Sequence, residues 1–141
     1  MDPQEIANLF SGLRDGELAG LRLEEGDLQF QVVLPKLAAM RGEGFQRFLC
    51  RVGHVQGLSL QPFRNESVEI RDLGQINRLQ LRVERAEVSE GGWIRVFCAH
   101  RGSQSGARLS MRGTEMQVWD EAFDPVTSAD LGILRGKAAG K

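Results

Sequence analysis

The chain has 141 residues, a hydrophobic fraction of 41% and a formal net charge of −1 at pH 7. This length suits one domain whose core needs neither a metal nor a disulfide. A net charge so close to zero creates no overall field to attract nucleic acid or an anionic membrane. Residues 1–5 lack a signal-peptide pattern and no apolar run reaches transmembrane length, so we expect a cytoplasmic protein.

A short amphipathic helix is predicted near the N-terminus. Asp2 is a suitable N-cap and Pro3 a suitable first helical residue. Gly12 and Gly16 limit the helix to about three turns. The apolar side chains at helical spacing, which we expect to pack on a sheet, are Ile6, Leu9, Phe10 and Leu13.

Residues 17–35 predict the first β-hairpin. Apolar and polar residues alternate on both sides of Glu25–Gly26, which suits a two-residue turn. The inward side chains of this hairpin would be Leu21 and Leu23 on one strand, and Leu28 and Phe30 on the other. A loop with one turn of helix is expected to follow.

Two further hairpins are predicted from the same alternation. Residues 44–63 would turn at Gly53–His54, and residues 107–119 would turn at Gly113–Thr114. Residues 67–74 predict a short strand and a turn between the first of these and the centre of the chain.

The central hairpin, residues 78–99, has the longest strand pattern. Its alternation slips by one residue at Arg85, which predicts a β-bulge because a slip would otherwise turn every later side chain to the other face. A three-residue turn then places Glu87 opposite Arg95 on the outer face.

These elements predict a single mainly β domain (β-rich α+β). We expect an antiparallel meander of eight to nine strands that forms a sandwich or a strongly curled sheet, with a short helix at each end. Thr127 or Ser128 would cap the second helix. The expected parts are an N-terminal helix and turn (1–16), an antiparallel β core (17–119), a C-terminal loop and helix (120–136) and a frayed tail (137–141).

One candidate binding surface follows the last predicted strand. A cluster of carboxylates in a loop could hold a hard cation, but the spacing here matches no calcium loop, and acids before a helix also act as caps. Aromatic residues beside such a patch are typical of protein-binding hot spots. We therefore predict no metal or cofactor, and a partner-binding surface made of Trp119, Asp120, Glu121, Phe123 and Asp124.

No catalytic group is predicted, and we expect the chain not to be an enzyme. His54 and His100 fall in a predicted turn and at a loop edge. Cys50 and Cys98 alternate with apolar residues, and buried thiols are poor nucleophiles. Residues 102–106, GSQSG, have glutamine where a nucleophile elbow has serine, and no lysine for a phosphate loop.

Arginine supplies fifteen of the eighteen basic residues, and several arginines are predicted on the outer face of the sheet. Sheets that bind nucleic acid add exposed aromatic side chains for stacking, and this chain has no tyrosine. Acidic residues at Glu84, Glu87 and Glu115 also interleave with the arginines. We therefore predict an ion-paired, solvated face and no nucleic-acid partner.

Four features follow one another along the chain: Asp15-Gly16-Glu17-Leu18, a hairpin, the strand that contains Phe48, and the ending Trp119-Asp120-Glu121. This order resembles small β-rich bacterial domains of unknown function, several of which are similar to immunity proteins of contact-dependent or polymorphic toxin systems. Those families have a His-Asp pair where this chain has Arg14-Asp15. The resemblance implies a stoichiometric protein binder with no catalysis of its own.

Two functions are compatible with the sequence. The favoured one is a non-enzymatic interaction module that binds another protein or a second copy of itself, because the edges of a sheet have to be covered. The alternative is a domain that binds a small apolar ligand in a cavity between helix and sheet. That cavity would be lined by Phe10, Phe30, Phe45, Phe48 and Trp93.

Overall fold

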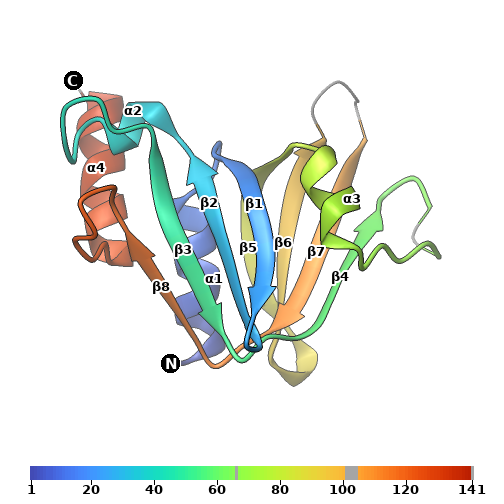
Figure 1. Cartoon of the computed structure of the whole chain (residues 1–141). Helices are drawn as coiled ribbons and strands as arrows, with labels where there is room; N and C mark the ends of the chain where they lie inside the picture. The colour runs from blue at the N-terminus through green and yellow to red at the C-terminus, as the bar shows by residue number, and fades with distance from the viewer. Residues whose placement is uncertain (66, 101–104, 141) are drawn as a thin grey trace.

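The computed structural model describes residues 1–65, 67–100 and 105–140. The helices are α1 (Pro3–Gly12), α2 (Pro35–Ala38), α3 (Leu73–Arg78) and α4 (Ser128–Gly140). The strands are β1 (Glu17–Glu24), β2 (Asp27–Val33), β3 (Arg47–Gly53), β4 (Gln56–Pro62), β5 (Leu81–Ser89), β6 (Trp93–His100), β7 (Gly106–Arg112) and β8 (Glu115–Trp119). The chain is thus mainly β, as predicted, with eight antiparallel strands in one sheet that does not close on itself (Figure 1).

The sheet consists of two sets of three consecutive strands, each completed by a strand from the other half of the chain. The strand order is β4-β7-β6-β5-β1-β2-β3-β8, so β4 lies beside β7 and β8 lies beside β3. The two sets meet between β1 and β5, where Glu17 pairs with Arg82. Figure 1 shows the β3–β4 and β7–β8 connections passing each other at the narrow end of the molecule. There the amide of Thr114 donates to the carbonyl of Gly53 at 2.9 Å.

The hairpins predicted at Gly53–His54 and Gly113–Thr114 are therefore wrong. The first of these turns is attached to the β1–β2 turn: the amide of His54 donates to Oδ1 of Asp27 at 2.9 Å, and the amide of Val55 donates to the carbonyl of Gly26 at 2.8 Å. These bonds direct the chain across the molecule instead of back along β3. The predicted meander is present only within each set of three strands.

The first and central hairpins are confirmed. The β1–β2 turn is Glu25–Gly26, and the register of β5 shifts between Val83 and Arg85. Glu87 faces Arg95 as predicted. However, the Glu87 carboxylate pairs with Arg85 of its own strand, at 3.0 Å.

A second bulge, in β1, was not predicted. Gly20 has a φ of +64°, and the register shifts beside it. Leu21 remains buried, but Leu23, predicted to point inward, is 51% exposed. The side chain of Asn77 on α3 fills the gap in the hydrogen bonding: its amide nitrogen donates to the carbonyl of Leu21 at 3.0 Å, and its oxygen accepts from the amide of Leu21 at 2.8 Å.

The region before β5 also differs from the prediction. In place of a strand at 67–71, the structure has an isolated bridge between Leu60 and Ile70. Asp72, predicted in a turn, is the N-cap of α3 and accepts from the amide of Gln75 at 3.0 Å. Because α3 runs to Arg78, β5 begins only at Leu81.

The hydrophobic core lies between the sheet and α1, which contacts β5, β6 and β8. Asp2 caps α1 as predicted, accepting from the amide of Gln4 at 2.7 Å. Phe10 on α1 stacks on Phe30 of β2, with 5.8 Å between ring centroids. These contacts fix the face of the sheet opposite α1 as the outer face.

The C-terminal helix is longer than predicted. Thr127 and Asp130 cap it reciprocally, since the Thr127 hydroxyl accepts from the Asp130 amide at 3.0 Å and the Asp130 carboxylate accepts from the Thr127 amide at 2.9 Å. Residues 137–140, expected in a frayed tail, are helical, and Lys141 lies outside the described residues. None of the helices described is long and apolar enough to cross a membrane.

Candidate partner-binding site

The loop after β8 is held by the side chain of Asp120. This residue is 2% exposed, and its carboxylate forms an ion pair with Nε of Arg41 at 3.0 Å. The same carboxylate accepts from the amides of Ala122 and Asp124 at 2.9 and 3.1 Å. Asp120, one of the five predicted site residues, is therefore buried and stabilises the conformation of the loop.

Glu121 fixes the other side of this loop. Its carboxylate accepts from the amide of Gln46 and, at 3.1 Å, from that of Arg47. These amides lie at the start of β3, so Glu121 joins the end of β8 to the neighbouring strand. The Glu121 carboxylate, like that of Asp120, therefore has its hydrogen-bond partners within the chain.

Phe123 and Asp124 are the most exposed of the five predicted site residues. Phe123 is 71% exposed and has a φ of +63°, a left-handed conformation that is rare for bulky residues. Asp124 is exposed, and its carbonyl accepts from the amide of Asp120 at 3.0 Å. The loop thus presents a large apolar side chain on a closely hydrogen-bonded backbone.

Trp119 joins Phe123 in a groove on the outer face of β1, β2, β3 and β8. Trp119 is half-buried at the end of β8, beside Leu49 of β3. The groove has a volume of about 520 Å³. Besides the two aromatic rings, its lining includes Arg22, Gln29, Gln31, Leu49 and Arg51. We call this the outer groove.

The polar side chains of the outer groove are hydrogen-bonded to one another or to neighbouring side chains of the sheet. Arg22 donates to Gln29 at 2.6 Å. Arg51 donates to Asp27 at 2.9 Å and to Gln117 at 3.0 Å. An apolar centre with a hydrogen-bonded polar rim is the usual composition of a protein-binding surface.

The carboxylates near the loop do not form a metal site in the part of the chain that is described, where no group of three suitable ligands occurs. Asp120 is occupied by Arg41. The pKa of Asp130 lies below its usual value because its carboxylate accepts from the backbone and side chain of Thr127. Asp120 and Asp130 therefore have structural roles in their own loop and helix cap.

The residues considered for catalysis are not brought together as a reactive group. His54 is exposed in the β3–β4 connection, and His100 ends β6. Cys50 and Cys98 are free, buried thiols. Burial raises the pKa of both, that of Cys98 to about 12, so both stay protonated at neutral pH. Most of the GSQSG segment, residues 102–104, lies outside the described residues.

The outer face of β5, β6 and β7 carries two aromatic side chains. Trp93 and Phe97 are half-buried on it. Each is covered by a cation: Arg112 lies 5.5 Å from the Trp93 ring centroid, and Arg85 lies 4.0 Å from that of Phe97. These rings are thus already stacked on arginine.

Sequence reasoning missed the strand residues of the outer groove and Arg41. The alternation of β2 and β3 does indicate that Gln29, Gln31 and Arg51 point outward. It does not indicate that β8 lies beside β3, which is what brings Trp119 to them. No protein-family profile, curated protein or solved structure matches this chain.

Proposed function

We propose that the chain is a non-enzymatic protein-interaction module that binds a partner protein through Phe123, Trp119 and the outer groove. The observation that carries this proposal is the combination of high exposure and a left-handed backbone at Phe123. That conformation costs about 1–2 kcal/mol in a residue with a side chain. Strain of this kind concentrates at functional sites, where the surrounding structure maintains it.

The hydrogen bonds of Asp120 and Glu121 maintain the left-handed conformation of Phe123. They hold the loop in one conformation before any partner arrives, so binding would not have to order it. An exposed phenylalanine next to a tryptophan, with polar side chains around them, matches the usual arrangement of a binding hot spot. The resemblance to immunity proteins supports the same class of function, a stoichiometric binder.

The proposal includes a strongly curled sheet rather than a sandwich, and a cytoplasmic location. All eight strands belong to one hydrogen-bonded sheet, which favours curling. Two buried free cysteines are in keeping with a reducing compartment. The alternative, a cavity for a small apolar ligand, gains no specific support, since Phe10, Phe30 and Phe48 are packed in the core.

Replacing the exposed aromatic residue tests the proposal. We expect Phe123→Asn to abolish capture of a partner from a lysate of the source organism by the immobilised chain. Asparagine tolerates a positive φ, so the free energy of unfolding should be unchanged or higher by about 1 kcal/mol. The readouts are quantitative mass spectrometry of the bound proteins and urea unfolding of each variant.

The matched control is Ile133→Gln, which removes another exposed apolar side chain, on α4. We expect this variant to retain the captured partner. Capture that survives Phe123→Asn, or that both variants abolish equally, would contradict a site centred on Phe123.

A further inference from the structure

The glutamine side chains of the outer groove present hydrogen-bond donors. The side-chain oxygen of Gln29 accepts from Arg22 at 2.6 Å, and that of Gln31 accepts from Arg47 at 2.8 Å. Because arginine has donors and no acceptor, a glutamine bonded to it must use its oxygen, which leaves the amide nitrogen without that partner. Neither of the two –NH2 groups bonds to another residue in the part of the chain that is described.

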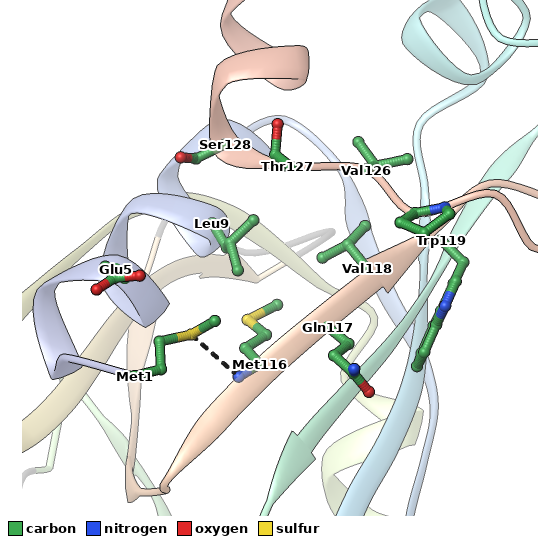
Figure 2. Close-up of a pocket in the computed structure, with 11 residues that line it drawn as sticks. Met1, Glu5, Leu9, Met116, Gln117, Val118, Trp119, Val126, Thr127 and Ser128 are labelled. Carbon is green, nitrogen blue, oxygen red and sulfur yellow. Dashed lines mark hydrogen bonds between the residues drawn. The ribbon is translucent and has the colours of Figure 1, made fainter.

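Strand β8 adds two more donors on the same face. Gln117 and Trp119 point to one side of β8, whereas the buried Val118 points to the other (Figure 2). The side-chain oxygen of Gln117 accepts from Arg51 at 3.0 Å, so its amide nitrogen is again a donor. The indole N–H of Trp119 can only donate, and it has no acceptor among the residues described. The outer face of β2 and β8 is therefore rich in directed donors.

The charged side chains that line the outer groove are all cations. Arg22 and Arg51 belong to the lining, and none of the described residues that form it is an aspartate or a glutamate. Glu24 pairs with Arg22 at 3.0 Å from outside the lining. Asp27 and Glu115 pair with Arg51 in the same way, at 2.9 and 3.7 Å. These carboxylates partly neutralise the arginines, so the directed donors chiefly decide what the groove accepts.

A lining made of donors selects an occupant that accepts hydrogen bonds. An ionised carboxylate has acceptors only, and hydrogen bonds to it are stronger than those between neutral groups. An ammonium group would lose its water there without gaining an acceptor, which is unfavourable. Asp124, the exposed carboxylate of the neighbouring loop, does not line the groove. Leu49 and the rings of Trp119 and Phe123 suit an apolar side chain beside the carboxylate.

We propose that the outer groove binds an acidic segment of the partner protein: an aspartate or glutamate carboxylate accepts from the amides of Gln29 and Gln31, and an adjacent apolar side chain packs on Trp119 and Phe123. This inference rests on the proposed function and names the chemistry of the partner. The groove volume of about 520 Å³ is in the range of sites that hold ligands. A single-stranded nucleic acid fits less well, because phosphates need cations and the arginines here are already paired.

The side-chain amide signals in NMR spectra of the isotope-labelled full chain test this proposal. The probe is a capped hexapeptide with two glutamates and one phenylalanine among serines, added up to about 5 mM, a concentration that detects weak binding. We expect saturable downfield shifts of the –NH2 signals of Gln29 and Gln31. The –NH2 signal of Gln56, on β4, should not move. The same peptide with glutamine in place of glutamate should bind about tenfold more weakly, because its hydrogen bonds are uncharged.

Two variants remove the donors without removing the bonds that hold the side chains. Gln31→Glu keeps an oxygen for Arg47 and replaces the –NH2 group by a second, negative oxygen; Gln29→Glu makes the same change beside Arg22. We expect each variant to keep the urea unfolding midpoint and to weaken binding of the acidic peptide at least about tenfold. Gln56→Glu is the matched control, since it adds the same charge outside the groove, and it should leave the affinity unchanged.

Three results would overturn the inference: unshifted Gln29 and Gln31 signals at the highest peptide concentration, equal affinity for the glutamate and glutamine peptides, or tighter binding of a uridine oligonucleotide than of the acidic peptide. The last would assign the groove to nucleic acid. If the acidic peptide fails while Phe123-dependent capture persists, only the chemistry of the partner is wrong. If capture does not depend on Phe123 either, the proposed function is wrong as well.

Discussion

Asp120 illustrates how one residue's role depends on contacts distant in sequence. Its carboxylate accepts from two amides of its own loop and pairs with Arg41, which is 79 residues away in the chain. The neighbouring Asp124 has the same side chain but remains exposed. One carboxylate therefore stabilises the fold, and the other is available at the surface.

We predict that Asp120→Ala lowers the free energy of unfolding by about 2–4 kcal/mol, because it leaves two amides and a partly buried guanidinium without their acceptor. Urea unfolding followed by fluorescence measures this loss. Asp124→Ala, as control, should change stability by no more than about 0.5 kcal/mol. Equal effects of the two variants would show that Asp120 does not hold the loop.

At this scale the sequence identifies a candidate segment but not the structural roles of its residues. Composition and position indicated a surface from Trp119 to Asp124, since aromatic and acidic residues follow a strand there. The burial of Asp120 could not be predicted, because it depends on Arg41. Nor could the partners of Glu121, which are amides at the start of β3.

Asp27 connects two elements through its carboxylate. The pKa of Asp27 lies below its ordinary value, first because the backbone amide of His54 donates to it and then because Arg51 does. A carboxyl group whose pKa is lower in the folded state stabilises the fold above its unfolded pKa, about 3.9. That contribution is lost as the pH falls through the lower, folded pKa.

We therefore predict that Asp27→Asn is less stable than the natural chain at pH 7, and that the difference shrinks when both are measured near pH 3. The midpoints of urea unfolding at the two pH values give the comparison. Glu43→Gln reports the effect of removing an exposed charge alone. A difference that stays constant between the two pH values would exclude a charged Asp27 as the anchor of the β3–β4 connection.

Asn77 connects α3, which was not predicted, to β1, which was. The bulge at Gly20 shifts the register of β1 against β2, β1 pairs with β5 only at Glu17–Arg82, and the Asn77 amide group bonds to both backbone groups of Leu21. We predict that Asn77→Ala costs about 1–3 kcal/mol, since both backbone groups of Leu21 lose their partner. Amide exchange at Leu21 should accelerate as well.

Gln75→Ala is the matched control for Asn77→Ala, because Gln75 is an exposed residue of the same helix. We expect it to leave the exchange rate of Leu21 unchanged. If the two variants accelerate exchange at Leu21 to the same extent, the effect comes from the helix as a whole, and Asn77 does not act as a strand substitute.

Among the elements, the β1–β2 and β5–β6 hairpins were predictable. The β3–β4 and β7–β8 connections, which lead to distant strands, were not. The turn at Glu25–Gly26 and the bulge near Arg85 follow from residue type and alternation within about twenty residues. The turns at Gly53 and Gly113 carry similar local signals. Their outcome depends on which distant strand offers the better partner, and alternation contains no information about that.

The whole molecule is built from two sets of strands that complete each other. The β1-β2-β3 set gains β8, and the β5-β6-β7 set gains β4, so each half of the chain supplies one strand to the other half. Without β8, the edge of β3 would expose the backbone groups that now pair from Leu49 to Gly53. The same holds for β7 without β4.

This exchange predicts how the chain behaves when it is divided. Fragments 1–66 and 67–141 separate the two sets, and each fragment then carries a strand, β4 or β8, whose partner is in the other fragment. We expect neither fragment to unfold cooperatively alone, because its sheet is incomplete and half of the core is missing. An equimolar mixture should recover the circular dichroism spectrum and the cooperative urea transition of the intact chain, with a midpoint that rises with concentration. Fragment 1–66 showing a cooperative transition by itself would mean that β1-β2-β3 is an independent unit, which would contradict mutual completion.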